Sequence, residues 1–397
     1  MTNNVCLQPA PQWRDDVEAA PVRKRAAVAN ASVRPLEERD LETLADLFMQ
    51  RFRKARRNAR ARAEIAAYMK SLYLDYPTRE GAPGSLVWVD PAGAIGAFLG
   101  GVRAGFTFEG SPLNACVSGT LMASEAPGHT LAAVHLLRES RKLDYDLIVT
   151  DSANRASLAM CQAMNYQVAS PESLEWAYVF EPAGVALHKL SQRFRAPWLA
   201  ALKPAAKAAD LGARAMLQAA VGASKRCEWR DEAVDAETFV DVAPRFLETF
   251  RLRPAFSREE FLWLIDMARQ RRSAGPLTLR IVYDPCGAPA AAYAAFGGKG
   301  DVARVFHAAA APHAWGKLFD KMRETAREAG AIGIHGALRT PMMAHAYSVK
   351  GVFFYYAHGT MIYSNRPDIR RAIETGDAFL GGFAGDRWTR LASDKFG

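Results

Sequence analysis

Residues 116–166 decide the fold of this chain, and they read CVSGTLMASEAPGHTLAAVHLLRESRKLDYDLIVTDSANRASLAMCQAMNY. The stretch 116–124 is short, partly alternating and contains β-branched residues, and the turn-forming pair Pro127-Gly128 follows it, so we expect a strand and a tight loop. From Thr130 apolar residues recur at helical spacing, which predicts an amphipathic helix. Residues 147–150 then predict a buried strand, and residues 155–164 predict a second helix.

This order of strand, loop, helix and strand makes a βαβ unit. The helix after the first strand directs unpaired backbone N–H groups at the loop, and such an N-terminus suits a phosphate group. Every βαβ crossover produces the same geometry, so an ordinary crossover without a ligand is an alternative at this point.

The composition is that of a globular protein with room for two or three domains, since the chain has 397 residues, of which 50% are hydrophobic and 23% charged. No stretch approaches the roughly 20 apolar residues of a membrane span, and the N-terminus lacks a basic-then-apolar secretory pattern. We therefore expect a cytoplasmic protein without a transmembrane segment. The cysteines (Cys6, Cys116, Cys161, Cys227 and Cys286) are scattered without CxxC spacing, which argues against a disulfide framework and a metal cluster.

The formal charge of +9 favours anionic partners. Much of it gathers in one predicted helical stretch, which contains Arg51, Arg53, Lys54, Arg56, Arg57, Arg60 and Arg62. These side chains go all round a helix, so a merely solvated helix would leave them repelling one another, and an anionic partner at the Arg51 to Arg62 helix is the better explanation. Aromatic residues of the base-stacking kind are not interleaved, so we do not expect nucleic acid.

Breaks in composition divide the chain into five segments. Residues 1–30 predict a disordered tail, residues 31–182 and 227–368 two domains, and residues 183–226 a basic helical linker. The linker packs between the domains or, as an alternative, makes a peripheral membrane contact through Trp198, Leu199 and Leu202. Residues 369–397 predict a strap docked across the domain junction, and its polar and aromatic residues between glycines are Asp377, Asp386, Arg387 and Trp388.

The order of elements in the first domain recurs in the second. The first domain starts with a strand near Val33 and two helices, continues with a hairpin over 86–99 and the βαβ unit, and ends with a final strand over 174–180. In the second domain, strands over 277–283, 290–296 and 302–308 precede a helix over 313–328 and a strand over 332–335. This internal repeat predicts two domains of one architecture.

The order and its residues resemble the GNAT superfamily of N-acetyltransferases over about residues 32–181. Val33-Arg34-Pro35 with Asp40-Leu41 is similar to the family's opening R-x-x-x-x-D-L segment, Val87 to Phe98 to its V-x-x-x-G-x-I-G hairpin, and Asn154 with Asn165-Tyr166 to its N...GF ending. The resemblance implies an α/β (α+β) protein with two tandem GNAT-like domains. Each would be a mixed, mostly antiparallel twisted sheet with a central βαβ unit and flanking helices.

The resemblance also implies a co-substrate, acetyl-CoA or another acyl-CoA, and no metal. In the family the loop amides hold the pyrophosphate through a Q/R-x-x-G-x-G/A motif. Here Gly128 stands at the Q/R position, Leu131 at the first Gly and Ala133 at the last, so the Leu131 side chain lies where the backbone should approach the phosphates. The residues implied to contact the donor are Met122, Ala123, Ser124, Gly128, His129, Thr130, Leu131, Ala132, Ala133 and Asn154.

Three residues are implied as catalytic. Glu125 and His129 flank the loop and are candidate bases for an amine, although a solvent-facing histidine is an equal alternative for His129. Cys161 stands where many members of the family carry the tyrosine that protonates the thiolate of CoA. A thiol, with a reference pKa of about 8.5, can take over that role. The alternative for Cys161 is a small buried residue on the inner face of its helix.

We therefore expect an N-acyltransferase that transfers an acetyl or other acyl group from CoA to an amine acceptor such as an amino sugar or a peptide. Two alternatives stay open. One is a non-catalytic tandem GNAT-like binding module, because neither half keeps the full phosphate motif. The other is an aminoacyl-tRNA-dependent peptidyl transferase, which the basic helix suggests.

Overall fold

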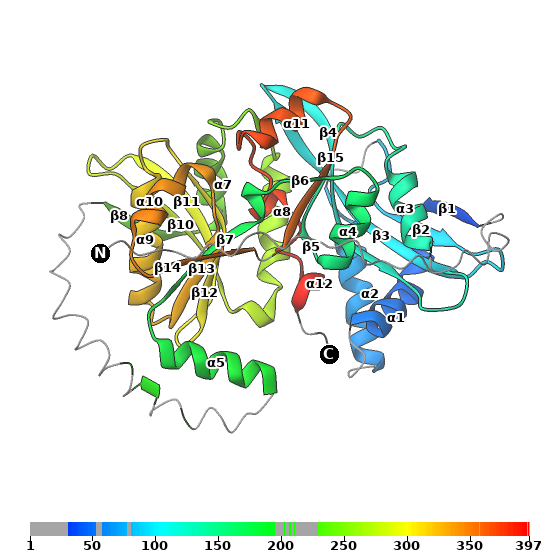
Figure 1. Ribbon diagram of the computed structural model, residues 1–397, viewed down its shortest axis with the longest axis horizontal. Coiled ribbons are helices and arrows are strands. Elements are labelled where there is room, and N and C mark those ends of the chain that lie inside the picture. Colours follow the sequence, from blue (N-terminus) through cyan, green and yellow to red (C-terminus); the bar gives the residue numbers. More distant parts are fainter. Residues whose placement is uncertain are drawn as a thin grey trace, which may run out of the picture.

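The computed structural model describes residues 31–52, 58–77, 81–129, 131–194, 202, 206–207, 210, 229–356, 358–394 and 396. They form two α/β halves, each built on one mixed sheet (Figure 1). The first sheet has the strand order β1-β2-β3-β4-β5-β15-β6, and β9 pairs with β3 at its side. Its strands are β1 (Ser32–Pro35), β2 (Leu86–Val89), β3 (Ile95–Phe108), β4 (Ser111–Ala123), β5 (Leu147–Ala153), β6 (Gln167–Val168), β9 (Leu252–Pro254) and β15 (Gly359–Tyr363).

The second sheet has the order β14-β7-β13-β12-β11-β10-β8. Its strands are β7 (Leu174–Val179), β8 (Arg230–Val234), β10 (Leu277–Tyr283), β11 (Pro289–Phe296), β12 (Val302–Ala310), β13 (Gly333–Ala337) and β14 (Val352–Tyr356). The helices are α1 (Leu41–Phe52), α2 (Ala59–Tyr73), α3 (Ala132–Ser140), α4 (Arg155–Ala163), α5 (Pro182–Phe194), α7 (Ala236–Val242), α8 (Arg258–Arg269), α9 (Trp315–Glu328), α10 (Met343–Ser348), α11 (Pro367–Glu374) and α12 (Arg390–Ser393).

The βαβ unit predicted from residues 116–166 is confirmed as β4, α3 and β5, with α4 after it. Helix α3 exists because its small and aliphatic residues repeat at helical spacing, and that face is buried on the sheet. Helices α3 and α4 cover one face of the first sheet, where Leu136 joins a cluster with Trp88. Helices α1 and α2 cover the opposite face, where Phe48 and Ile65 pack with Phe98.

The two halves exchange their last strands, which the sequence did not reveal. The prediction that residues 174–180 close the first sheet is wrong, because β7 lies between β13 and β14 of the second sheet. In return β15, from the end of the second half, fills the position between β5 and β6 in the first sheet. Both strands are apolar enough to be buried in either sheet, so local pattern could not assign the sheet.

In each sheet the central parallel pair stays together over only a few residues. Strands β4 and β5 pair from Ala115–Leu147 to Val117–Val149 and then diverge. Strands β12 and β13 pair from Val302–Gly333 to Val305–Gly336 and then diverge in the same way. We call these the first and second divergence, and each leaves strand backbone that must find another partner.

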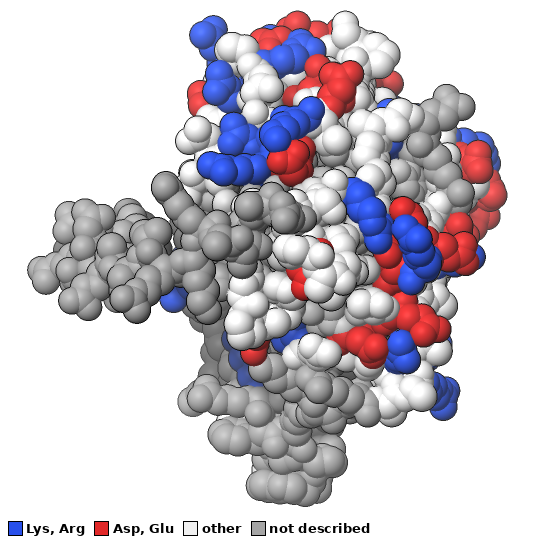
Figure 2. All heavy atoms as spheres, turned by 90° about the vertical axis from the view of Figure 1, so that its right-hand side faces the viewer, with Lys and Arg blue, Asp and Glu red and all other residues white. Residues whose placement is uncertain are grey.

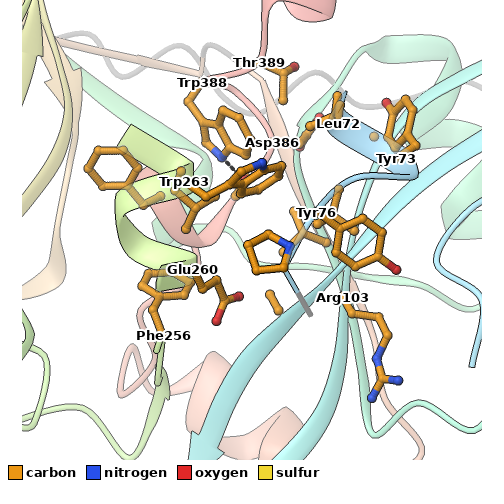
Figure 3. Close-up of a pocket in the computed structure, with 18 of the residues that line it drawn as sticks. Leu72, Tyr73, Tyr76, Arg103, Phe256, Glu260, Trp263, Asp386, Trp388 and Thr389 are labelled. Carbon is orange, nitrogen blue, oxygen red and sulfur yellow. Dashed lines mark hydrogen bonds between the residues drawn. The ribbon is translucent and has the colours of Figure 1, made fainter. Parts of the chain in front are cut away.

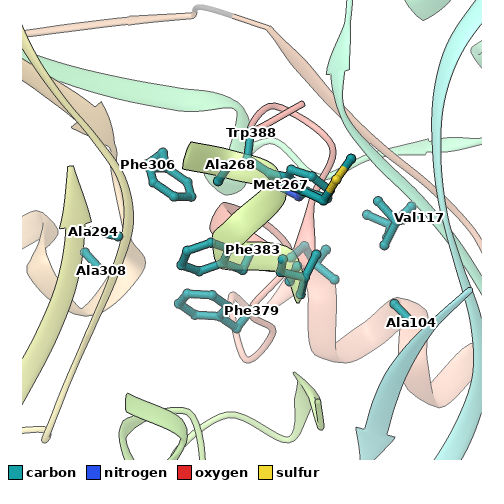
Figure 4. Close-up of a cluster of buried hydrophobic side chains, with 14 of the residues drawn as sticks. Ala104, Val117, Met267, Ala268, Ala294, Phe306, Ala308, Phe379, Phe383 and Trp388 are labelled. Carbon is teal, nitrogen blue, oxygen red and sulfur yellow. The ribbon is translucent and has the colours of Figure 1, made fainter. Parts of the chain in front are cut away.

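The described part of residues 377–396, here called the C-terminal segment, runs between the two halves (red in Figure 1). It starts beside β9, where the Phe379 N–H donates to the Leu252 carbonyl at 2.9 Å. Its Phe379, Phe383 and Trp388 are buried in one cluster with Met267 of α8 and with side chains of both sheets, such as Val117 and Phe306 (Figure 4). This cluster joins the two halves into one core.

Part of the predicted basic helix lies outside the described residues, namely Arg53, Lys54, Arg56 and Arg57. Two of its described arginines have acidic neighbours: Arg51 lies 2.5 Å from Glu125, and Arg62 lies 3.0 Å from Glu42. Figure 2 shows basic and acidic side chains intermixed on the face of the molecule that it draws. The anionic partner of this helix therefore stays a prediction.

The limits of the predicted tail, linker and domains also stay predictions. Residues 1–30 and most of 195–228, with Trp198 and Leu199, lie outside the described residues. Among the residues that the structure describes, no helix combines the length and the apolar character that crossing a membrane requires.

The exchange of strands predicts that the halves cannot fold separately. A fragment of residues 31–182 lacks β15, which leaves β6 without its partner and β5 with an open edge. We expect this fragment to show no cooperative unfolding transition by circular dichroism, and its co-expression with residues 183–397 to restore the transition of the full chain. A single sharp melting transition of the isolated fragment would contradict the exchange.

Candidate active-site pocket

A pocket lies on the face of the first sheet that α2 covers, between that sheet, α8 and the C-terminal segment (Figure 3). Its empty space is about 500 Å³ counted out to the mouth, of which about 20 Å³ is wide enough for the centre of a water molecule. The pocket is therefore a narrow slot. The lining residues are Leu72, Tyr73, Tyr76, Pro77, Val102, Arg103, Ala104, Val117, Gly119, Thr120, Phe256, Glu260, Trp263, Leu264, Phe383, Gly385, Asp386, Trp388 and Thr389.

The floor of the pocket is an irregular part of β4. The pairing of β3 with β4 shifts register between Phe98 and Gly100, and Thr120 has a φ of 57° in the left-handed region. Such a bulge bends a strand and re-aims its backbone groups. Gly119 is required here, because a Cβ at this position would lie 2.7 Å from a carboxylate oxygen of Asp386.

Asp386 closes the first divergence. Its Oδ1 accepts hydrogen bonds from the Thr150 hydroxyl at 3.0 Å and from the Asp151 N–H at 2.9 Å, and its Oδ2 accepts one from the Ser152 hydroxyl. In return the Asp151 carboxylate accepts from the backbone N–H groups of Asp386 at 2.7 Å and of Arg387 at 3.0 Å. The carboxylate of Asp386 thus supplies acceptors to β5 beyond the point where β5 leaves β4, and it lies close to Gly119 of β4.

The carboxyl group of Asp386 has an unusual pKa for an aspartate. Burial, and after it the charge of the neighbouring Asp151, raise the pKa of Asp386 well above its usual range. It is 7% exposed and borders the pocket. A carboxyl group of this kind can hold or release a proton close to neutral pH, which is what a general base requires.

Glu260 is a second buried carboxyl in the pocket. It comes from the first turn of α8, where its side chain is 5% exposed and its Oε1 accepts from the Gly105 N–H at 3.2 Å. Burial raises the pKa of Glu260 to about 7, while hydrogen bonds from backbone N–H groups act in the opposite direction. No lysine, arginine or histidine among the described residues forms an ion pair with it, and so its charge has no counterion within this part of the protein.

The C-terminal segment is fixed on both sides of the pocket by buried ionic contacts. Arg390 binds Asp394 at 2.7 Å and Glu64 of α2 at 2.8 Å, and its backbone N–H donates to the Tyr68 hydroxyl at 3.0 Å. The Asp394 carboxylate also accepts from the Ser273 N–H at 2.7 Å. The segment is therefore a permanent wall of the pocket, not a loosely laid strap.

The second divergence is filled differently, by aromatic side chains. His307 of β12 is fully buried, contacts the rings of Phe239, Phe379 and Phe383, and neither of its ring nitrogens has a partner in the described structure. Burial lowers the pKa of His307 to about 3, so it is neutral. Gly382 of the C-terminal segment lies against it, with φ of 70° and no room for a Cβ. This divergence holds packed core, not a site.

The loop predicted to hold the donor leads from β4 into α3. Gly128 has a φ of 91°, which only glycine adopts easily, and Leu131 is the N-cap of α3 without a side-chain capping bond. Leu131 is 50% exposed, whereas Ala132 and Ala133 are buried against the sheet. The start of α3 is thus left without a side-chain cap. Thr130 lies outside the described residues.

The other predicted residues are not gathered at one point. Glu125 pairs with Arg51, and His129 Nε2 lies 3.4 Å from Asp90 with its ring against Trp88. The Asn154 side chain caps α4 by accepting from the Ser157 N–H at 3.0 Å. Cys161 is 4% exposed in the apolar cluster under α3 and α4, where burial raises the pKa of its thiol to about 11.

Sequence reasoning missed both buried acids. Ser257 and Glu260 have the spacing of a helix capping box, and Ser257 does cap α8 by accepting from the Glu260 N–H at 3.1 Å. That signal marks a helix start and says nothing of the pocket. Asp386 was noted only as part of the strap, because its partners on β5 lie far away in sequence.

Comparisons with known proteins agree with this architecture. No protein-family model matches the chain, and no curated protein matches it. Among solved structures, a GCN5-related N-acetyltransferase from Anabaena variabilis ATCC 29413 aligns with a TM-score of 0.53 at 10% identity, over 84% of this chain and 72% of its own. A conserved protein of unknown function from Enterococcus faecalis V583, described as a probable N-acyltransferase, aligns with a TM-score of 0.51 at 11% identity over the same shares.

At such identities the likeness concerns the fold. It confirms the predicted architecture of mixed sheets with flanking helices, repeated in two halves. The chain has the fold of the GCN5-related N-acetyltransferases.

Proposed function

We propose that the first half binds an acyl-CoA and transfers its acyl group to an amine held in the pocket. The observation that carries this proposal is the start of α3, which has no side-chain cap and directly follows β4 where β4 and β5 diverge. Free N–H groups at a helix N-terminus favour phosphate groups. A donor bound there can run along β4 toward the pocket floor.

The first half is the better candidate of the two. The equivalent helix of the second half, α9, begins with Trp315, which is 3% exposed and packs against Phe250. Its Gly316 lies against the ring of His345, because a Cβ there would be 3.0 Å from that ring. Together with the aromatic filling of the second divergence, these contacts leave little space for a donor in the second half.

The residues proposed for the donor follow from the geometry of β4 and its loop. The Ser124 N–H donates to the Gly96 carbonyl at 2.8 Å and therefore faces β3. Because successive backbone amides of a strand point to opposite edges, the Ala123 N–H faces the divergence and is the better oxyanion donor than Met122 or Ser124. Residues Gly128 to Ala133 would hold the phosphates, with Leu131 displacing them outward from the tight position that a glycine allows.

The reaction needs a base, and we assign this role to Asp386. The amine nitrogen bonds to the thioester carbonyl carbon and the carbon–sulfur bond breaks. The amine proton passes to the Asp386 carboxylate and is returned to the CoA sulfur, so the products are an amide and a free thiol. Glu125, His129 and Cys161 would then act in packing and in holding the loop, in keeping with their contacts to Arg51, Asp90 and the apolar cluster.

A second candidate is a non-catalytic module that binds a small molecule in the same pocket. The observation that favours it is that the Asp386 carboxylate already accepts hydrogen bonds from Thr150, Asp151 and Ser152 of β5. If these hydrogen bonds keep Asp386 from accepting the amine proton, the pocket binds an amine without acyl transfer. Release of free thiol from acyl-CoA in the presence of an amine decides between the two candidates.

The donor site predicts an effect of charge at the start of α3. Leu131→Glu is expected to weaken binding of acetyl-CoA by about fivefold to tenfold, because a carboxylate beside the helix N-terminus competes with the phosphates for the same dipole. The matched control is Leu190→Glu, which adds the same charge at a similarly exposed leucine of α5. Calorimetric titration of both variants measures the effect. Equal affinities of the two variants for acetyl-CoA would show that the donor does not bind at this loop.

If Asp386 is the base, its replacement should lower turnover without weakening the binding of the donor. Asp386→Asn keeps the shape of the side chain but cannot accept the amine proton, so we expect kcat to fall about 10²-fold to 10⁴-fold. Binding of acyl-CoA should change little. Asp377→Asn, in the half-exposed start of the same segment, serves as the control. Full activity of Asp386→Asn, measured by thiol release, would exclude Asp386 as the base.

The raised pKa of Glu260 predicts that the free energy of unfolding depends on pH. Its pKa is about 7 in the folded state and about 4.5 when exposed, so the unfolded chain loses this proton first as pH rises. The folded state is therefore penalised progressively between pH 4.5 and 7, by on the order of 3 kcal/mol above pH 7. We expect Glu260→Gln to be more stable than the wild type at pH 8 but not at pH 5 in urea unfolding. The same difference at both pH values would argue against a buried ionisable group.

A further inference from the structure

The chemistry of the pocket points to the kind of amine that it accepts. We infer that the acceptor is a primary amine carried on an aromatic or aliphatic body, without sugar hydroxyls or anionic groups. This inference rests on the proposed acyl transfer and names the acceptor of that same site. It replaces the expectation of an amino sugar.

The walls of the pocket are largely apolar and rich in rings. Tyr73 and Tyr76 stand on the α2 side, and Phe256, Trp263 and Trp388 on the side of α8 and the C-terminal segment (Figure 3). The rings of Trp263 and Trp388 meet edge to face with centroids 5.9 Å apart. Aromatic faces attract ammonium groups and pack against apolar bodies, but they leave the hydroxyl groups of a sugar without partners.

Two of the charged side chains that line the pocket are carboxyl groups. Glu260 and Asp386 both border the space, and Glu260 has no cationic partner among the described residues. Among the described residues of the lining, Arg103 is the one basic residue. Its Nη2 donates to Asn114 at 3.0 Å, and Figure 3 shows its guanidinium directed away from the two carboxyl groups. A buried carboxylate without a counterion is costly, and an ammonium ligand supplies the missing charge.

The two acids enter the pocket at different places. Asp386 lies at Gly119, beside the first divergence where the donor would end. Glu260 bonds to Gly105, which is further along β3 than Gly100, the partner of Gly119. The two carboxyl groups therefore border the slot at positions several residues apart along β3, so one can hold the ammonium body while the other faces the reacting atoms. Glu260 is then a specificity residue, and Asp386 the residue at the reacting atoms.

The narrowness of the slot adds a limit on shape. Of about 500 Å³ of empty space, which includes open solvent, only about 20 Å³ admits the centre of a water molecule. That is room for about one water molecule. An amine must therefore displace lining side chains to enter, and a flat ring or a single hydrocarbon chain displaces fewer of them than a wider body does. A puckered ring with hydroxyl groups on both faces needs more width and more hydrogen-bond partners than the lining supplies.

The test compares two probes of nearly equal shape, 2-phenylethylamine and 2-phenylethanol, with glucosamine as the amino sugar. Binding to the full chain is followed by tryptophan fluorescence, because Trp263 and Trp388 line the pocket. We expect the amine to bind at least about tenfold more tightly than the alcohol, the range for a hydrogen bond to a charged group, and also more tightly than glucosamine. Equal affinity for amine and alcohol, or tighter binding of glucosamine, would overturn the inference.

Variants then attribute the preference to Glu260. Glu260→Gln should lose the preference for the amine while its affinity for 2-phenylethanol stays the same. The matched control Glu237→Gln makes the same change on α7, where Glu237 is exposed and paired with Arg258. Should Glu260→Gln fail to fold, the comparison of the two probes on the wild type still decides the inference.

The outcome separates the inference from the proposed function. Preferential binding of the amine, combined with no binding of acyl-CoA, would support the pocket chemistry and overturn acyl transfer. Acyl-CoA-dependent thiol release with glucosamine but not with 2-phenylethylamine would support acyl transfer and overturn the inferred class of acceptor.

Discussion

The exchange of hydrogen bonds between Asp151 and Asp386 holds the centre of this molecule together. Each carboxylate accepts from the backbone of the other segment, and Asp386 also accepts from the hydroxyl groups that flank Asp151 on β5. Where β4 and β5 part, these donors would otherwise be buried without acceptors, at a cost of about 1–3 kcal/mol each. The interaction therefore satisfies the donors of β5 where β5 leaves β4, and it holds Asp386 at the border of the pocket.

The C-terminal segment fills the divergence with different side chains in each half. In the first half it brings a polar group into the divergence and leaves a slot beside it. In the second half it brings Phe379, Phe383 and Gly382 against His307, and the divergence becomes part of the core. Two copies of one architecture have thus taken different roles through a few side chains of one shared segment. A carboxylate lies in the first divergence and two phenyl rings lie in the second, so only the first half has a pocket beside its divergence among the described residues.

Local periodicity was enough to predict most helices and strands. The βαβ unit over residues 116–166, helix α9 and the strands β10, β11 and β12 are where alternating or helical spacing put them. The destination of β7 was not predictable, because its alternation fits either sheet and no local residue encodes a crossover between halves. Strands β14 and β15 were not recognised at all. For them, pairing with distant strands decides the structure, not local propensity.

The candidate site was less predictable than the fold, for a physical reason. Residues such as His129 and Cys161 attract notice in a sequence because of their type, yet here their surroundings are Asp90, Trp88 and an apolar cluster. Glu260 and Asp386 look ordinary in the sequence, and their altered pKa values come from burial. Burial of a carboxyl at the junction of two halves depends on contacts between residues far apart in the chain, which a single sequence does not display.

The exchange of β7 and β15 also has a consequence for synthesis on the ribosome. Many multidomain proteins fold from the N-terminus onward, each domain completing its core before the next has emerged. This chain cannot follow that order, because the first sheet waits for residues 359–363 and for Asp386. The nascent first half must remain an unfinished sheet, with β5 lacking a neighbour, while most of the second half is being translated. Until β15 has been made, that open edge can pair with strands of other chains.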